Sequence, residues 1–295
     1  MKHIISLSDQ YFSPGVCPVW LYEAVQENVS AALAEDLPAS DLSTDTTVQQ
    51  ISREAVIRSN DAAVIAGQFW VDEVFRQMPT EVTVDWQVQD GQSVPAKQQL
   101  CTITGHQPAM LQAERCALNF LQTLSGTATT VARYVAQLDQ TSHTQITDTR
   151  KTIPGLRLAQ KYAVVCGGGI SHRFNLSDGV LLKDNHITMY GSITRAVAVA
   201  RSRAVGQAIE IEVRTLPQIQ QALSANVDVI MLDNFALDDI AKALTMIDGQ
   251  AKVEISGNLG LEDIKTVADY GVDYISIGAL TKHLHAIDMS MTIKE

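Results

Sequence analysis

Residues 208–234 read AIEIEVRTLPQIQQALSANVDVIMLDN: an apolar run, a stretch with helical periodicity, and a second apolar run. Short apolar runs bounded by turn residues are typical of buried strands, and the stretch between these two is long enough for one helix. A strand, a helix and a second strand make a βα unit, in which the two strands lie parallel in one sheet. This stretch therefore decides the fold class of the second half of the chain.

The same alternation continues on both sides of this stretch. Apolar runs recur as QITDT, GVLLK, AKVEIS and DYISIG, and helix-like stretches such as ALDDIAKALTMIDG and NLGLEDIKTVADYG separate them. A repeat of roughly 20–30 residues suits a parallel α/β barrel. No GxGxxG motif opens any of these units, which argues against a dinucleotide-binding fold. We therefore expect a barrel.

The first part of the chain has a different pattern. It combines one helical stretch, WLYEAVQENVSAALAEDL, with short strand-like runs, AVIRSN, AAVIAG and VTVDWQV, separated by turn residues. This mixture indicates a domain of helices and antiparallel strands up to about residue 110. The long helical stretch MLQAERCALNFLQTLSGTATTVARYVAQLDQ then leads into the barrel, with a break expected at Ser125-Gly126.

Composition excludes several classes of function. The 295 residues carry a formal net charge of -11, which disfavours nucleic acid as a partner because phosphate binding needs a wide basic face. There is no secretory signal and no stretch of about 18 apolar residues, so we expect no membrane partner. The four cysteines show no CxxC pairing and are expected to be reduced thiols. These features predict a cytoplasmic protein.

Charged or small residues stand at the end of each predicted barrel strand, where ligands bind in such barrels. The order of these residues along the chain is cationic, then anionic, then small. The residues are Thr149, Arg150, Lys151, Lys183, Glu212, Asp233, Ser256, Gly257, Ile277, Gly278 and Ala279.

This order of charge predicts a particular kind of ligand. Arginine offers two parallel donors that match a carboxylate, and cations in general suit carboxylates or phosphates. Two carboxylates opposite them suit Mg²⁺ or ribose hydroxyls, and the small residues expose backbone amides for a phosphate. The pattern therefore indicates a site for an anionic small molecule and a phosphorylated sugar, with Mg²⁺.

Three glycines, Gly167 to Gly169, come directly before the segment that contains His172 and Arg173. They follow the helix-like stretch LAQKYAVVC, so they either cap that helix or let a ligand approach the backbone. We leave both interpretations open. Next to Arg173, His172 is expected to contact ligand rather than to be a core histidine.

The motifs DTRKTIPGLR, KYAVVCGGGISHRFNLSDGVLLKDNH, IEIEV, IMLDN and ISIGALTKH, in this order and spacing, resemble the quinolinate phosphoribosyltransferase family. EDLPASDLSTDTT and AERCALNFLQTLSGTAT extend the resemblance over nearly the whole chain. It implies an N-terminal α/β sandwich domain and a C-terminal open α/β barrel, TIM-like but with fewer than eight strands. We assign residues 1–125 to the sandwich domain with its bridge helix, 126–280 to the barrel, and 281–295 to a tail packing on the sandwich domain.

The resemblance also implies an activity. Enzymes of this family join quinolinate to phosphoribosyl pyrophosphate with Mg²⁺, giving nicotinate mononucleotide, pyrophosphate and CO₂ in the de novo synthesis of NAD. They work as homodimers with shared active sites. What such a site must stabilise is positive charge at the sugar C1 as pyrophosphate leaves.

The resemblance implies roles for the candidate residues. Arg150, His172 and Arg173 match residues that hold quinolinate, and Arg115 matches one that reaches over from the neighbouring subunit. Glu212 and Asp233 match the residues that stabilise the sugar cation through Mg²⁺ or directly. Lys151 and Lys183 match catalytic residues near phosphates and carboxylates, and the backbone around Ser256-Gly257-Asn258 matches a phosphate contact. Asn258 departs from the SGG of some relatives.

Glu210 and the other histidines are not assigned a definite ligand-binding role. Glu210 is expected to be structural and paired with a barrel lysine, whereas His186 either binds ligand or orients its loop. His283 and His285 are expected at the surface or in packing.

Two rival functions remain open. A paralogue with the same fold from molybdenum transport operons, or a nicotinate-using relative, would dispense with part of the dicarboxylate pocket. A non-catalytic dicarboxylate-binding protein would have no use for Glu212 and Asp233.

Overall fold

The computed structural model describes residues 13–37, 41–44 and 51–294. The described residues form two compact units, and several chain segments contribute to each. One unit contains Arg133–Lys151 and Gly169–Ala279; the other contains most of the first 132 residues, Thr152–Gly168 and the C-terminal segment from Leu280. The segment EDLPASDLSTDTT lies partly outside the described residues. Within the described residues, no helix is both long and apolar enough to cross a bilayer.

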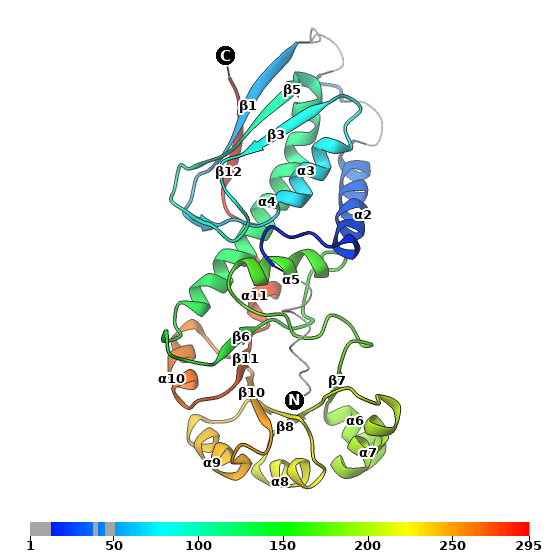
Figure 1. The fold of residues 1–295 in the computed structure, drawn as a ribbon, viewed down its shortest axis with the longest axis vertical. Helices are drawn as coiled ribbons and strands as arrows, with labels where there is room; N and C mark the ends of the chain where they lie inside the picture. The colour runs from blue at the N-terminus through cyan, green and yellow to red at the C-terminus, as the bar shows by residue number, and fades with distance from the viewer. Residues whose placement is uncertain (1–12, 38–40, 45–50, 295) are drawn as a thin grey trace. The chain divides into compact units, whose positions relative to one another are not determined.

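The first unit is built around a sheet of six parallel strands in the order β6-β11-β10-β9-β8-β7 (Figure 1). The strands are β6 (Gln145–Thr147), β7 (Val180–Leu182), β8 (Ile209–Val213), β9 (Val229–Asp233), β10 (Lys252–Ser256) and β11 (Tyr274–Ser276). Each lies in one of the apolar runs picked out above. β6 and β7 end the sheet and do not pair with each other among the described residues, so the barrel is open. The predicted fold class is confirmed.

Helices follow the strands and cover the outside of this sheet (Figure 1). They are α6 (Asp184–Tyr190), α7 (Ile193–Arg203), α8 (Leu216–Ser224), α9 (Leu237–Ile247) and, after the 3-10 turn η1 (Leu261–Asp263), α10 (Ile264–Asp269). In α9, Ile240, Ala243 and Ile247 are buried at a spacing that makes one apolar face. Asp238 and Asp239 in its first turn favour the helix start electrostatically.

The second unit contains an antiparallel sheet in the order β12-β1-β5-β3. Its strands are β1 (Ser52–Ser59), β3 (Val82–Trp86), β5 (Gln99–His106) and β12 (Met289–Ile293), so the end of the chain supplies an edge strand beside β1. A small pair, β2 (Ala63–Val64) and β4 (Ser93–Val94), lies apart from this sheet. The predicted mixture of helices and antiparallel strands is confirmed.

Among the described residues, this unit also has four helices and one short turn of helix. They are α2 (Val19–Asp36), α3 (Gln68–Arg76), α4 (Gln107–Val135), α5 (Arg157–Cys166) and α11 (Ala279–Lys282); a few residues of α4 and α11 are assigned to the first unit. The apolar side of α3 buries Trp70, Val71, Val74 and Phe75. This packing, rather than helix propensity alone, holds such a short helix.

Helix α4 runs without interruption, so the break predicted at Ser125-Gly126 is wrong. Ser125 is buried, and its hydroxyl oxygen accepts a hydrogen bond from the backbone N–H of Ala66 at 3.1 Å. A Cβ atom at Gly126 would overlap the carbonyl oxygen of His285. The two residues therefore serve close packing, which outweighs their low helix propensity.

The three glycines end helix α5. Gly167 is the C-cap residue, and Gly168 has φ of +86°, the left-handed conformation that glycine adopts without strain. A Cβ atom at Gly167 would overlap the carbonyl oxygen of Ala128. Of the two interpretations left open, helix capping is therefore the one that the structure supports.

Candidate active site

A cavity of about 310 Å³ lies at the carboxyl ends of the parallel strands. Its walls come from residues that follow β6, from residues in and directly after β7, from the segment containing His172 and Arg173, and from residues within β9, β10 and β11. The lining residues are Asp148, Thr149, Arg150, Lys151, His172, Arg173, Leu181, Lys183, Met231, Glu254, Ser256 and Ser276. A cavity of this size at this place in a barrel suits a small molecule.

Four cations line this cavity: Arg150, Lys151, Arg173 and Lys183. Arg173 is 8% exposed and donates a hydrogen bond to the carbonyl oxygen of Gly179 at 3.0 Å. Burial, together with the neighbouring Arg150 guanidinium, lowers the pKa of Arg173. Crowding cations in a partly dehydrated site costs free energy that a bound anion recovers. The cavity is therefore built for an anion.

Two carboxylates stand at the ends of the neighbouring strands β8 and β9, as the sequence predicts for Glu212 and Asp233. Lys183 donates to Glu212. Arg214 joins the two carboxylates, with 3.5 Å from its Nη2 to Glu212 and 3.0 Å from its Nε to Asp233. We call Glu212 and Asp233, with Lys183 and Arg214, the rim cluster. The sequence analysis missed Arg214, although it follows β8 directly.

The rim cluster does not form a ready magnesium site. Both oxygens of Glu212 face a cation, and those of Asp233 accept from Arg214 and, at 3.0 Å, from the Asn234 amide. Carboxylate oxygens are ligands that Mg²⁺ prefers, but these would have to give up their present partners. We therefore derive no step through a protein-bound magnesium ion.

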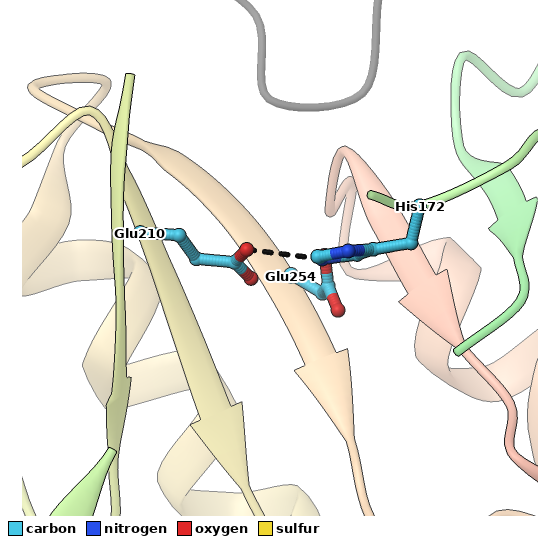
Figure 2. Close-up of side chains that lie close together, drawn as sticks. All are labelled: His172, Glu210 and Glu254. Atoms are coloured by element: carbon cyan, nitrogen blue, oxygen red, sulfur yellow. Dashed lines mark hydrogen bonds and ion pairs between the residues drawn. The ribbon is translucent and has the colours of Figure 1, made fainter. Parts of the chain in front are cut away.

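His172 and two buried glutamates form a second acidic group, deeper in the barrel (Figure 2). Glu210 on β8 and Glu254 on β10 are both 0% exposed, and His172 is 5% exposed. The Nε2 atom of His172 lies 3.0 Å from Glu210 Oε2 and 3.6 Å from Glu254 Oε2. We call these three residues the floor cluster. Among the residues that the structure describes, they form the group that has the geometry to hold a metal ion.

The hydrogen bonds of His172 define its protonation. Its Nδ1 atom accepts the backbone N–H of Arg173 at 2.8 Å, so the ring proton is on Nε2 and is donated to Glu210. The imidazole is therefore neutral, and the expected lysine partner of Glu210 is wrong: its partner is His172. A proton joins this pair.

The two glutamates of the floor cluster hold protons more tightly than ordinary carboxylates. Burial raises the pKa of Glu254 to about 8, and the nearby charge of Glu210 adds to this effect. Burial also raises the pKa of Glu210 to about 7. Two carboxylates side by side in a dry site cannot both ionise at low cost. At neutral pH the pair therefore keeps a proton.

Glu254 was not among the predicted site residues. The signal was present in the sequence, because KVEIS places a glutamate inside an apolar strand, just as IEIEV does for Glu210. Asp148 and Ser276 also line the cavity and were not predicted. Asp148 accepts the backbone N–H of His172 at 2.9 Å and so fixes the start of this segment.

The predicted phosphate contacts lie close to the cavity but only one of their residues lines it. Ser256 does so, whereas Gly257 and Asn258 form a turn with φ of +108° and +28°. The backbone N–H of Ile277 donates to the carbonyl oxygen of Thr147 at 3.0 Å. Gly278 and Ala279 follow at the start of α11.

The remaining predicted residues lie elsewhere. Arg115 is exposed on α4, in the other unit. His186 accepts the backbone N–H of Lys183 at 2.9 Å and caps α6, so it orients this loop. His283 and His285 are exposed, which agrees with the surface position expected for them.

These features define an α/β protein with an anion site at the carboxyl edge of its parallel sheet and with a second unit that contains an antiparallel sheet. Comparison with known proteins gives the family. Residues 41–125 match the model of the quinolinate phosphoribosyl transferase N-terminal domain, and residues 127–292 match that of the C-terminal domain. The chain belongs to the quinolinate phosphoribosyl transferase family.

Individual relatives are similar over most of their length. A probable nicotinate-nucleotide pyrophosphorylase (carboxylating) of Bacillus subtilis is 37% identical, over 88% of this chain and 90% of its own. One from Synechocystis is 36% identical over 95% and 96%. The structure of the nicotinate-nucleotide pyrophosphorylase of Francisella tularensis superposes with a TM-score of 0.89 at 40% identity, covering 92% of this chain and 97% of the other.

Proposed function

We propose that this protein transfers the phosphoribosyl group of phosphoribosyl pyrophosphate to quinolinate and removes one carboxylate as CO₂, forming nicotinate mononucleotide for NAD synthesis. The observation that carries the proposal is the cavity of about 310 Å³ with four cations at the barrel's carboxyl edge, in a chain of this family. Quinolinate is a small dianion, so its charge and size match such a cavity.

The two arginines of the cavity hold the two carboxylates of quinolinate. Each guanidinium presents a fork of donors that fits a carboxylate, and Arg173 is already fixed by its bond to Gly179. Both ring nitrogens of His172 are engaged within the protein, so its ring shapes the cavity wall rather than supplying a second charge. Thr149 and Lys151 lie beside Arg150 on the same wall.

The rim cluster serves the phosphoribosyl group. Glu212 and Asp233 accept ribose hydroxyls and stabilise the positive charge that develops at C1 as pyrophosphate leaves. Lys183, Lys151 and Arg214 are cations that a highly charged phosphate draws towards itself, which frees the two carboxylates for the sugar. The backbone from Ser256 to Asn258 and from Ile277 to Ala279 is the proposed place for the terminal phosphate.

In this proposal, Mg²⁺ binds together with phosphoribosyl pyrophosphate. The oxygens of Glu212 and Asp233 have protein partners, whereas pyrophosphate offers Mg²⁺ the phosphate oxygens that it binds well. The cytoplasm is the proposed site of action, because the four cysteines are free thiols, as expected in a reducing compartment.

The decisive experiment follows three products in one reaction. The protein is incubated with quinolinate, phosphoribosyl pyrophosphate and Mg²⁺, and nicotinate mononucleotide, pyrophosphate and CO₂ are quantified. Equal amounts of all three support the proposal. Turnover of nicotinate in place of quinolinate would contradict it, and so would quinolinate binding without any product.

The active sites are shared within a homodimer in this proposal, and Arg115 reaches the cavity of the partner subunit. Its exposed position on α4 supports this role, because none of the described residues of its own unit buries its side chain. Mixing inactive Arg115→Ala chains with inactive Glu212→Ala chains should then restore up to about a quarter of wild-type activity, since random mixed dimers make up half of the population and hold one intact site each. A mixture that stays inactive, although mass spectrometry shows that subunits exchange, would contradict sharing.

A further inference from the structure

The proposed function, on which this inference rests, includes a decarboxylation. This step needs a proton donor that none of the roles assigned so far supplies. When the carboxylate at C2 of the pyridinium ring departs as CO₂, the electrons of the broken bond stay on C2. The product carries hydrogen at this carbon, so a proton must arrive there. A protein that excludes water from its cavity needs an acid of its own for this step.

Glu254 is an acid that faces the cavity. Its side chain is fully buried from bulk solvent, yet it contributes to the cavity lining, whereas Glu210 does not. Neither oxygen of Glu254 has a hydrogen-bond partner among the described residues. Buried carboxyl groups are almost always satisfied, so an unsatisfied one that faces a ligand cavity indicates a ligand as its missing partner.

The proton of the floor cluster is available on Glu254 at neutral pH. Burial raises the pKa of Glu254 to about 8. Glu210 accepts the Nε2 proton of His172, which favours the ionised form of Glu210 and leaves the shared proton on Glu254. Its polar neighbours are His172, Glu210 and, on β11, Ser276. A carboxylic acid kept neutral by its surroundings is a general acid suited to work near neutral pH.

Other acids of the cavity are less suitable. His172 gives its one ring proton to Glu210, and Lys183 donates to Glu212. Asp148 accepts the backbone N–H of His172 and holds that segment in place. The arginines do not release protons in proteins. An ammonium group is also a weaker acid than a carboxyl group with the pKa of Glu254.

We propose that Glu254 is the catalytic acid that protonates C2 of the pyridine ring as CO₂ leaves. The bond between C2 and its carboxylate breaks and leaves its electron pair on C2. The O–H bond of Glu254 breaks, and its proton forms the new C2–H bond. Glu254 remains as a carboxylate, which recovers a proton from water once the product has left.

The test separates the two halves of the reaction in a Glu254→Gln variant. Glutamine keeps the shape and loses the acid. Pyrophosphate release should stay within about threefold of wild type, while CO₂ release falls by about 100-fold or more, the usual effect of losing a general acid. Mass spectrometry should then detect the N-ribosylated dicarboxylate. Glu262→Gln, which changes an exposed glutamate of η1, is the matched control and should release both products as wild type does.

A second variant, Glu254→Asp, and a pH series of the wild type test the same role independently. Glu254→Asp retains the acid but withdraws it by one methylene, so its ratio of CO₂ to pyrophosphate should fall between those of wild type and Glu254→Gln. In the wild type this ratio should fall as pH rises from 7 to 9. The other titratable groups around Glu254 are Glu210, His172 and Tyr274, and Arg173 and Lys183 lie near Glu210.

The outcomes distinguish this inference from the proposed function on which it rests. A wild-type protein that forms no pyrophosphate from the two substrates overturns the function itself. If the wild type is active and Glu254→Gln releases CO₂ and pyrophosphate in the wild-type ratio, Glu254 is not the acid. Parallel loss of both products in the variants, or a ratio that does not vary with pH in the wild type, also overturns it.

Discussion

The rim cluster and the floor cluster place the same kind of side chain in two opposite environments. Glu210 and Glu212 are two residues apart on β8 and point to the same side of the sheet, because side chains alternate along a strand. Glu212 meets Lys183 and Arg214. Glu210 meets a neutral histidine and a second buried carboxyl group.

This difference assigns different chemistry to the two clusters. Cations beside a carboxylate favour its ionised form, so the rim cluster suits the stabilisation of positive charge. Burial beside another carboxyl group favours the protonated form, so the floor cluster suits proton donation. One strand, β8, therefore carries one carboxyl group of each cluster. Two variants should separate these properties.

The largest expected effect is at the rim. Asp233→Asn should lower single-turnover product formation by about 100- to 1,000-fold, because it removes a charge that acts mainly on the transition state. Quinolinate affinity, measured by calorimetry on the same variant, should stay within about twofold, since the cavity cations remain. Near-normal turnover would show that the rim carboxylates do not stabilise the sugar cation.

A smaller effect is expected from one cation of the cavity wall, Arg173, and one cation of the rim cluster, Arg214. Arg173→Ala removes a buried donor of the cavity wall, which typically costs 2 kcal/mol or more, or about 30-fold in quinolinate affinity. Arg214→Ala, at the exposed rim, should instead weaken phosphoribosyl pyrophosphate binding and leave quinolinate affinity nearly unchanged. Calorimetry with each ligand separately checks both variants. Equal losses of affinity for both ligands would mean that the same cations bind both substrates.

The sequence predicts the strands of the barrel better than it predicts the contacts of the floor cluster. All six strands lie in the expected apolar runs, because burial on both faces of a parallel sheet requires such runs. Arg150, Lys151 and Lys183 follow strand ends and are found by the same reasoning, whereas Arg173 comes after the glycines that end α5. The break expected in α4 fails because tertiary packing at Ser125 and Gly126 is invisible to local propensity.

The pairing of His172 with Glu210 cannot be predicted from local sequence patterns. The two residues are 38 positions apart, and a β-bridge between Thr147 and Ile170 brings the segment of His172 beside β6. Glu254 comes from a third segment. Each glutamate inside its strand predicts a buried polar neighbour, but only the folded chain shows that His172 lies beside both.

The last expected effect concerns stability rather than turnover, and it tests the floor cluster without any substrate. The pKa of Glu254 is about 8 in the folded protein, against an ordinary value of 4.5. Between these values the folded state binds more protons than the unfolded state does. The contribution of Glu254 to stability is therefore complete below about pH 4.5 and is lost as pH rises towards 8, by at most about 1.4 kcal/mol per pH unit. Glu254→Gln removes this dependence, so the variant should gain stability relative to wild type between pH 5 and pH 8. Urea unfolding at pH 5, 6.5 and 8 measures the difference, with Glu262→Gln as a control that should track wild type throughout. A difference that stays constant with pH would mean that Glu254 ionises alike in both states, and it would then be no reservoir for a proton.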